Sequence, residues 1–258
     1  METILFEVQN AVAFITLNRP EKLNAFNREM ALLLQQKLDE CGASHEIRCV
    51  YITGSGKGFC AGQDLAEVAD PTGIGMHGIL KDQFNPIVTK IRKLEKPVVA
   101  AVNGVAAGAG ANIALCCDIV VASSSASFIQ AFSKIGLIPD SGGTFTLPRL
   151  IGWQKASALM MLGEKVNADE AERMGMIYKV FADDVFEEES KKIAVTLAGM
   201  PTRGLWYTKQ ALSWAFSHTW HEQLMNEDKL QQRAAGTADF KEGVQAFLEK
   251  RKANFKGE

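Results

Sequence analysis

Residues 97–122 read PVVAAVNGVAAGAGANIALCCDIVVA, and this stretch decides the fold class. The segment 97–102 is short, apolar and rich in valine, which is typical of a buried strand. A glycine-rich turn follows, residues 108–117 read as a helix of small side chains, and residues 118–122 read as a second strand. Strand, turn, helix and strand form the βαβ pattern, which predicts parallel strands with helices packed outside them.

The sequence before this stretch continues the α/β pattern. Residues 8–17 (VQNAVAFITL) alternate in polarity and predict a hairpin with its turn at Gln9-Asn10. Four further elements are predicted there: a helix at 27–41 capped by Asn27, a buried strand at 49–53, a loop at 70–76 and a helix at 79–94.

Helices dominate the end of the chain, where strong strand signals are missing. The predicted helices lie at residues 156–162, 168–174, 187–199, 203–216, 222–232 and 241–250. We therefore expect an α/β region at residues 1–190 and a C-terminal helical region at residues 191–258. No internal repeat is detailed enough to predict a solenoid.

The composition disfavours several classes of partner. A chain of 258 residues can bury a sizeable core, and 47% hydrophobic with 22% charged residues is ordinary for a globular protein. A net charge of −2 offers no basic face for nucleic acid, and no apolar run reaches the roughly 20 residues that span a bilayer. The basic residues of segment 250–256 either solvate a helix end or contact phosphates.

The cysteines and histidines bear on the compartment and on metal binding. Five cysteines without a CxxC pair predict free thiols, and with no signal peptide we expect a reducing cytoplasm. His218 and His221 lie close in sequence but come without a further ligand pattern, so we expect no metal site.

Two glycine-rich segments, FCAGQDL at 59–65 and NGVAAGAGAN at 103–112, each follow a predicted strand. Glycine leaves backbone amides unshielded, so two such turns could donate N–H groups to an oxyanion. Close helix–sheet packing also needs small residues and is the structural alternative. A dinucleotide site is disfavoured because the third glycine and the following acid of its motif are missing, and the P-loop motif is absent.

Asp140 lies in a further glycine-rich segment, IGLIPDSGG at 135–143. Its carboxylate could move a proton while the two glycine turns stabilise an enolate. It could also cap a helix that begins near Thr144, which is worth about 1 kcal/mol and would keep the carboxylate ionised. The two roles are compatible, so both stay open.

The order and spacing of these three segments resemble the crotonase family, also called the enoyl-CoA hydratase/isomerase family, from Phe6 to Phe255. The resemblance implies a spiral α/β core of ββα repeats and a C-terminal helical region that covers the site and carries trimer contacts. It implies an acyl-CoA thioester substrate, with coenzyme A as part of the substrate and no other cofactor. It also implies a homotrimer, or a hexamer built as a dimer of trimers.

The same resemblance implies roles for individual residues. The backbone amides of Gln63 and Ala109 would hold the thioester oxygen, and Asp140 would be the base. Hydratases of the family carry two glutamates at the positions of Asn112 and Phe132, so a paired-carboxylate activation of water looks absent here. Phe132 either dries the pocket and raises the basicity of the carboxylate or is an ordinary core aromatic.

The resemblance also suggests a reaction. IGLIPDSGGT followed by LPRLIG is similar to the ring-1,2-epoxyphenylacetyl-CoA isomerases of bacterial phenylacetate catabolism. Isomerases that convert 3-enoyl-CoA to 2-enoyl-CoA in fatty acid metabolism are also near, and enoyl-CoA hydratase is the weaker alternative. Some members of the fold bind RNA or are inactive assembly partners. The near-neutral charge speaks against RNA, and Asp140 with both glycine turns speaks against an inactive protein.

Further residues are expected, by resemblance, to border the acyl-CoA. They are Lys22, Leu23, Ala25, Ala61, Gly62, Asp64, Leu65, Val105, Ala107, Phe132, Phe255 and Lys256. Of these, Phe255 and Lys256 resemble tail residues that meet the nucleotide of a neighbouring subunit. Lys22 lies in the segment RPEKLNA, and the alternative for it is an ordinary surface lysine. The segment 70–84 is expected to wall the acyl pocket.

Overall fold

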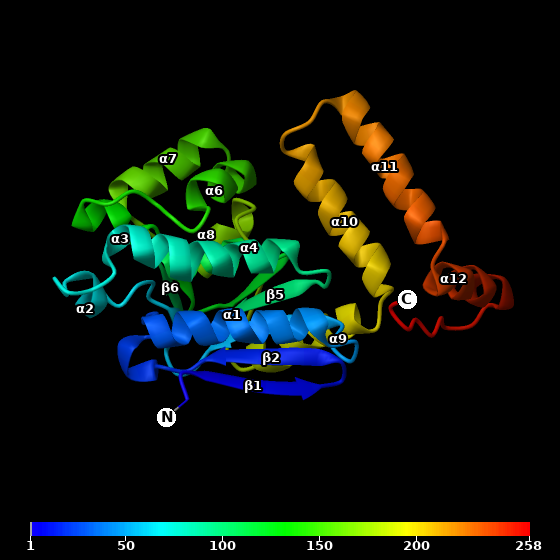
Figure 1. Cartoon of the computed structure of the whole chain (residues 1–258), viewed down its shortest axis with the longest axis horizontal. Helices are drawn as coiled ribbons and strands as arrows, with labels where there is room; N and C mark the ends of the chain where they lie inside the picture. Colours follow the sequence, from blue (N-terminus) through cyan, green and yellow to red (C-terminus); the bar gives the residue numbers. More distant parts are fainter. Residues whose placement is uncertain (1) are drawn as a thin grey trace.

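Residues 2–258 are described by a computed structural model, in which a six-stranded sheet forms the base of the molecule (Figure 1). Its strands, in spatial order, are β1 (Ile4–Gln9), β2 (Val12–Leu17), β3 (Cys49–Gly54), β5 (Val98–Val102), β7 (Ile119–Ser123) and β10 (Lys179–Phe181). The β1–β2 pair is antiparallel and every other pair is parallel. The parallel β3–β5–β7 order confirms the βαβ prediction.

A second sheet runs beside the first and is built from very short strands. They are β4 (Gly58–Cys60), β6 (Val105–Ala107), β8 (Ser127–Ile129) and β9 (Lys165–Asn167). Each of the pairs β3/β4, β5/β6 and β7/β8 gives one strand to each sheet, so the chain repeats a ββ step three times. This agrees with the ββα repeats that the family resemblance implies. The residue pattern alone did not reveal them because the second strand of each step has only three residues, too few to show a period of two.

The large sheet is covered on both faces, and its strands alternate accordingly. Val50 and Ile52 of β3 belong to the core cluster that contains α1 (Arg28–Ala43) and α4 (Asn85–Lys93). Cys49 and Tyr51, which point the other way, pack with α9 (Phe186–Ala198). This is the period-two alternation expected of a strand between two helical layers.

The remaining helices surround the sheets or form the C-terminal region. They are η1 (Pro20–Lys22), α2 (Leu65–Val68), α3 (Gly75–Gly78), η2 (Ile79–Phe84), α5 (Ala109–Leu115), η3 (Ala131–Ile135), α6 (Gly143–Ile151), α7 (Trp153–Leu162), α8 (Ala168–Arg173), α10 (Thr202–Ala215), α11 (Trp220–Ala235) and α12 (Ala238–Glu249). Asn27 caps α1 as predicted, because its side chain accepts a hydrogen bond from the Met30 amide. The division expected near residue 190 stays a prediction, and that position lies inside α9.

Two predicted elements were wrong in detail, and two short strands were missed. The hairpin turn is Asn10-Ala11, both with positive φ, because Gln9 pairs with Val12. The helix predicted at 79–94 begins as a π-helix, η2, and becomes α-helical only at α4. Pro86 lies at the start of α4, and a proline there cannot donate to the preceding turn. The short strands β9 and β10 were not predicted at all.

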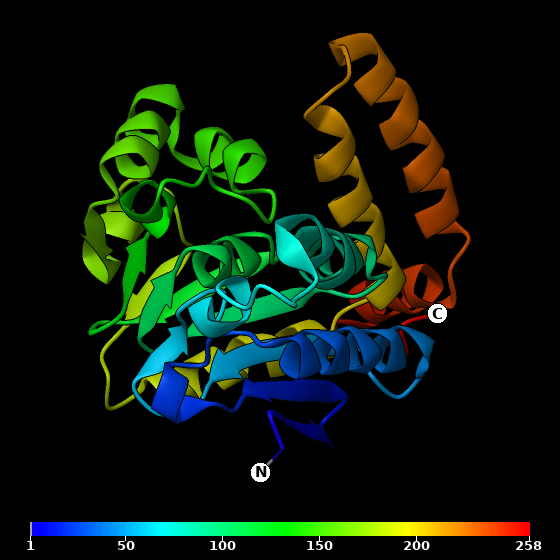
Figure 2. The same cartoon turned by 60° about the vertical axis from the view of Figure 1, so that its left-hand side comes forward.

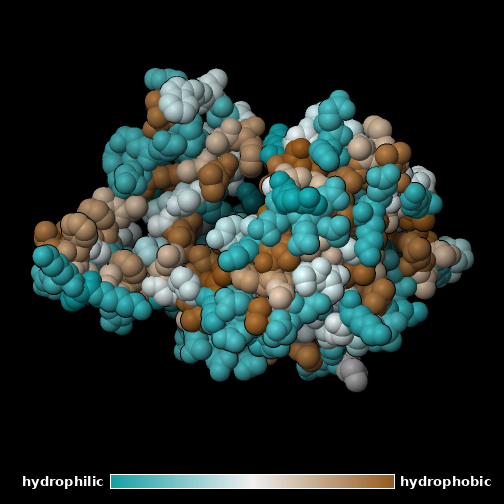
Figure 3. All heavy atoms as spheres, turned by 180° about the vertical axis from the view of Figure 1, so that it is seen from behind, coloured by the Kyte–Doolittle hydropathy of each residue, from teal (hydrophilic) through white to brown (hydrophobic). Residues whose placement is uncertain are grey.

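Helices α10 and α11 form an arm that projects from the core, and α12 returns beside the C-terminus (Figures 1 and 2). The buried Lys209 anchors α10: its Nζ donates to Asp118 Oδ2 at 2.8 Å and to the Ile91 carbonyl at 2.8 Å. A cavity of about 690 Å³ lies between α4, α6 and α10. Seen from behind, the surface is hollowed between the arm and the core (Figure 3).

Candidate active site

The segment around η1 runs alongside the first glycine turn and is hydrogen-bonded to it through the backbone. The Ala61 amide donates to the Leu23 carbonyl at 2.9 Å, and the Phe26 amide donates to the Gly62 carbonyl at 2.7 Å. The Asp64 amide returns a bond to the Phe26 carbonyl at 2.8 Å. These bonds bring the predicted residues of the two segments together.

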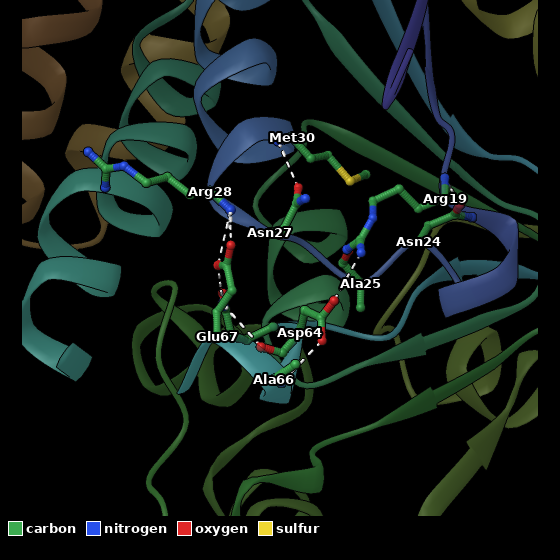
Figure 4. Close-up of polar contacts among 10 residues, drawn as sticks. Arg19, Asn24, Ala25, Asn27, Arg28, Met30, Asp64, Ala66 and Glu67 are labelled. Carbon is green, nitrogen blue, oxygen red and sulfur yellow. Dashed lines mark hydrogen bonds and ion pairs between the residues drawn. The ribbon is translucent and has the colours of Figure 1, made fainter. Parts of the chain in front are cut away.

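Side chains reinforce the same junction (Figure 4). Arg19 Nη2 lies 3.0 Å from Asp64 Oδ2, and the other Asp64 oxygen accepts from the Ala66 amide at 3.2 Å. Partial burial opposes ionisation of Asp64, but these hydrogen bonds outweigh it and lower the pKa of the carboxyl. Both oxygens of Glu67 accept from the Arg28 amide at the start of α1. The first glycine turn is therefore fixed from several sides.

The two glycine turns meet at Gly62 and Ala109. A Cβ atom added to Gly62 would lie 3.0 Å from the Ala107 carbonyl oxygen and 3.4 Å from the Ala109 amide nitrogen. Gly62 also has a φ of +95°, which side chains rarely adopt. Glycine is required here because the backbones approach too closely for any side chain.

The amide N–H groups of Gln63 and Ala109 have no acceptor among the hydrogen bonds of residues 2–258. Ala109 is the first residue of α5 and is buried, with 3% of its surface exposed. Nearly all buried backbone N–H groups in proteins are paired, so an unpaired one beside a second unpaired one indicates a site for an external acceptor. The close packing of Gly110 on Cys60 shows that the structural role of the small residues is real as well.

Asp140 begins a tight turn that precedes α6. The Gly143 amide donates to the Asp140 carbonyl at 2.8 Å, and Ser141 and Gly142 have φ of +52° and +76°, as in a type I′ turn. The helix cap is Gly142, which makes no side-chain cap bond, so the predicted capping role of Asp140 is wrong. The turn places the Asp140 carbonyl, not its carboxylate, toward the helix.

The carboxyl of Asp140 is left in a poorly solvated position. Burial raises its pKa above the ordinary value, and a hydrogen bond from Ser141 Oγ to Oδ1 at 2.8 Å partly offsets this. Oδ2 makes no hydrogen bond to any other group of the described chain. A carboxylate with a raised pKa and one free oxygen is suited to accept a proton.

Comparison with known proteins agrees with this geometry. The sequence profile described as "Enoyl-CoA hydratase/isomerase" matches residues 7–258. The chain belongs to the enoyl-CoA hydratase/isomerase family. It is 47% identical to the 1,2-epoxyphenylacetyl-CoA isomerase of Escherichia coli K12, covering 100% of this chain and 99% of that protein.

Other relatives show how broad the family is. The chain is 44% identical to a protein of Rhodobacter capsulatus described as "Probable enoyl-CoA hydratase", covering 99% of this chain and 98% of the relative. The crystal structure of an enoyl-CoA hydratase from Bacillus anthracis superposes with a TM-score of 0.92 at 33% identity, covering 100% of both chains. The crotonase-type fold predicted from the sequence is thereby confirmed, and family members act on acyl-CoA thioesters.

In this member of the family, Phe132 lies beside the second glycine turn. A Cβ atom on Gly108 would lie 3.7 Å from Phe132 Cζ, one residue before the Ala109 amide. Phe132 is 6% exposed, yet within the described chain it belongs to neither of the two main core clusters. This position fits a residue that lines the pocket, but both interpretations of Phe132 stay predictions.

The cavity between α4, α6 and α10 reaches the Asp140 turn at Gly142. Gly142 and Thr146 line it on one side and Leu212 and Phe216 of the arm line it on the other. Arg149 stacks over the rings of Phe145 and Phe216 at its rim. The arm is therefore part of the surroundings of the site, a contribution that its helical periodicity alone did not indicate.

Two predicted site residues lie apart from the others. The backbone amide of Lys256 donates to Asp239 Oδ1 at 2.6 Å, and the Phe255 ring lies against Gly243 of α12. Figure 1 shows this end of the chain on the side opposite α2 and α3. Their expected contact with a neighbouring subunit stays a prediction. In the nearby basic run, Arg251 is already paired with Glu242 and Glu249.

Sequence reasoning missed several side chains that support Asp140. Ser141 Oγ bonds the carboxylate, and Asn112 Nδ2 donates to the Asp140 carbonyl at 2.9 Å. Asn112 in turn accepts from Gln130. The one available signal was a glutamine inside an otherwise apolar run, SFIQAF. Among residues 2–258 no cluster of three potential metal ligands forms, and no helix is both long and apolar enough to cross a membrane.

Proposed function

We propose that this protein is an acyl-CoA isomerase that works through a thioester enolate. The observation that carries the proposal is the close approach of the two glycine turns at Gly62 and Ala109, where the amides of Gln63 and Ala109 have no acceptor among the described residues. The poorly solvated carboxylate of Asp140 belongs to a turn that Asn112 of α5 contacts. Amides of this kind stabilise the negative charge that develops on a thioester oxygen when a neighbouring carbon loses a proton.

The reaction would need only these groups. The amides of Gln63 and Ala109 hold the thioester oxygen while Asp140 Oδ2 takes a proton from the substrate carbon. Asp140 then returns the proton to a different carbon, so the double bond moves and no atom is added or lost. With an epoxide substrate, the same enolate-type stabilisation would accompany opening of the epoxide and expansion of the ring to an oxepin. Coenzyme A enters as part of the substrate.

Our first candidate substrate is 2-(1,2-epoxy-1,2-dihydrophenyl)acetyl-CoA, an intermediate of phenylacetate catabolism. The 47% identity to the Escherichia coli isomerase of that specificity supports it. The conversion of 3-enoyl-CoA to 2-enoyl-CoA makes the same chemical demands and is the second candidate. Hydration is disfavoured because Asn112 and Phe132 offer no second carboxylate to activate water.

Coenzyme A would lie along the junction of the first glycine turn. Lys22 and Leu23 end η1 beside Ala61, and Leu65 is half exposed next to Asp64. Ala107 lies at the Gly62–Ala109 contact, Val105 pairs with Gly58 at the start of β4, and the Ala25 amide donates to the Lys22 carbonyl. We propose that the pantetheine arm follows this strip, and that the distal acyl group points toward the cavity behind Asp140.

We further propose that the protein works as a homotrimer or as a dimer of trimers. The support is the exposure of large apolar side chains on the C-terminal helices, including Trp220, Phe240, Phe247 and Leu248. Phe240, Phe247 and Leu248 line one apolar hollow on α12, and apolar surface of this kind is usually covered by a partner. Sedimentation of the purified protein would reveal the state directly.

The reaction type can be tested by giving the purified protein 3-enoyl-CoA and 2-enoyl-CoA in separate reactions. We expect the 3-enoyl substrate to be converted to the conjugated isomer of unchanged mass. We expect the 2-enoyl substrate to gain no water on the same timescale. Rapid hydration of the 2-enoyl substrate would contradict the proposal, and a parallel reaction with the ring epoxide would rank the two isomerase candidates.

A further inference from the structure

A buried chain of side-chain amides connects the Asp140 turn to the small sheet. Gln130 Nε2 donates to Asn112 Oδ1 at 2.7 Å, and Asn112 Nδ2 donates to the Asp140 carbonyl at 2.9 Å. Gln130 is 5% exposed and Asn112 1% exposed, so both amides lie inside the protein. We propose that Asn112 and Gln130 are positioning residues that hold the Asp140 turn in its working place. The inference rests on the proposed role of Asp140 as the base.

We call the hydrogen-bonded chain Gln130–Asn112–Asp140 carbonyl the amide relay, and the direction of its two hydrogen bonds follows from chemistry. A carbonyl oxygen only accepts, so Asn112 must turn its NH₂ group toward Asp140 and its oxygen toward Gln130. Gln130 must then present its own NH₂ group to that oxygen. This leaves Gln130 Oε1 buried without a donor among the described residues, which is unfavourable for folding. Such an unpaired oxygen is expected where the NH₂ group of the same side chain has a functional role.

The Asp140 turn needs such external support. Ser141 is a non-glycine residue in the left-handed region, a conformation that persists only when its surroundings enforce it. With the Gly143 amide and Asn112 Nδ2 both donating to it, the Asp140 carbonyl uses both of its lone pairs. A Cβ atom on Gly143 would lie 2.3 Å from Asn112 Nδ2, so Gly143 leaves the space in which Asn112 reaches the turn.

The relay also ties the base to the oxyanion amides. Asn112 lies on α5, the short helix that begins with Ala109. Gln130 directly follows Ile129, whose carbonyl accepts the Gly108 amide at 2.9 Å. Two consecutive residues at the end of β8 therefore hold both the second glycine turn and, through Asn112, the Asp140 turn. The relay sets the separation between the charge-stabilising amides and the proton-accepting carboxylate.

The test replaces Gln130 by leucine, a side chain of similar size that cannot donate and that carries no unsatisfied oxygen. Gln130→Leu is expected to lower kcat roughly tenfold with KM unchanged, less than the about 10²-fold that a full misplacement of 1 Å costs. A loosened turn lets water reach Asp140, so the low-pH limb of the pH–rate profile is expected to move to lower pH. Asn112→Leu, which removes the direct contact, is expected to act in the same direction and more strongly.

The matched control is Ser190→Ala, which removes a different buried side-chain hydrogen bond, the 2.9 Å contact with Tyr51 between α9 and β3. It is expected to lower the unfolding temperature while leaving kcat and the pH profile unchanged. If Gln130→Leu behaves like this control, the amides have a structural role only and the inference is overturned. If Asp140→Asn retains full activity, the proposed function fails instead, so the two failures are distinguishable.

Discussion

The proposed site has two halves, the backbone amides of Gln63 and Ala109 and the carboxylate of Asp140, and different kinds of contact hold each half in place. The Gln63 and Ala109 amides belong to backbone that sheet-like hydrogen bonds and close glycine contacts fix, so hardly any side chain is needed to place them. Asp140 is a side chain on a strained turn, and other side chains hold it. The comparison teaches that the proposed oxyanion half should tolerate most side-chain changes except a Cβ at a close glycine contact such as Gly62 or Gly110. The proposed base half should be sensitive to polar substitutions.

The largest effect is expected from Asp140→Asn, which removes the base without changing the size of the side chain. We expect kcat to fall by roughly 10² to 10⁴, the usual contribution of a general base. Because burial raises the pKa of Asp140, the ionised carboxylate destabilises the folded state at pH values above that pKa, and this cost disappears below the unfolded pKa. The variant should therefore be at least as stable as the parent at neutral pH.

Steady-state kinetics and thermal unfolding of Asp140→Asn measure both effects. An inactive variant that is also less stable would indicate damage to the turn and would weaken the assignment of the base.

Gly62→Ala disturbs the proposed oxyanion half where its two glycine turns approach each other. The new Cβ would press on the Ala107 carbonyl and the Ala109 amide and would strain a φ of +95°. We expect kcat/KM to fall by about 10²-fold, the cost of losing one oxyanion donor. Gly152→Ala is the matched control, since Gly152, between α6 and α7, also has positive φ but no atom within 4 Å of the added Cβ. Equal losses in both variants would mean that backbone strain, not the amide contact, is responsible.

Arg19→Met tests whether backbone bonds suffice to hold the first glycine turn. The substitution removes the ion pair with Asp64, and we expect the free energy of unfolding to drop by about 1–2 kcal/mol. Because the Phe26 bonds to Gly62 and Asp64 remain, kcat should change much less than in Gly62→Ala. Denaturant unfolding and kinetics on the same preparation check this. A loss of kcat as large as that of Gly62→Ala would contradict the comparison.

Ser141→Ala is expected to have the smallest effect, which is a shift of the pH–rate profile. The Ser141 hydroxyl stabilises the ionised form of Asp140, so its removal should raise the pKa of that carboxyl further. Since the base must be ionised, the low-pH limb of kcat/KM should move to higher pH, opposite to the shift expected for Gln130→Leu. Alanine keeps the same left-handed backbone, so the strain at position 141 is unchanged. An unmoved limb would show that Asp140 does not set it.

The two glycine turns could be located from the sequence, whereas most contacts around Asp140 could not, and the roles of the turns as an oxyanion site and of Asp140 as a base stay proposals. A backbone site depends on glycine at fixed places, and Gly62 and Gly108 are visible as letters in 59–65 and 103–112. The relay to Asp140 joins residues 18 and 28 positions apart, and nothing in their spacing marks the contact. The capping prediction failed because Gly142, in the left-handed region, ends the turn and takes the cap position itself.

The secondary structure shows the same difference between elements that the sequence predicted and elements that it did not. Long periodic segments such as α1 and β3 were predicted within one or two residues because several turns or alternations report on the same face. Strands of three residues, such as β6 and β8, and the π-helix before Pro86 carry no comparable period. They form because other segments of the chain supply their hydrogen-bond partners, and the local sequence pattern does not reveal those partners.

The most direct test of the central claim is hydrogen exchange at the substrate carbons. The parent and Asp140→Asn would each be incubated with 3-enoyl-CoA in deuterated water, and deuterium at the α and γ carbons would be followed by mass spectrometry. We predict exchange together with double-bond migration in the parent and neither in the variant. Exchange that persists in Asp140→Asn would contradict the assignment of Asp140 as the base.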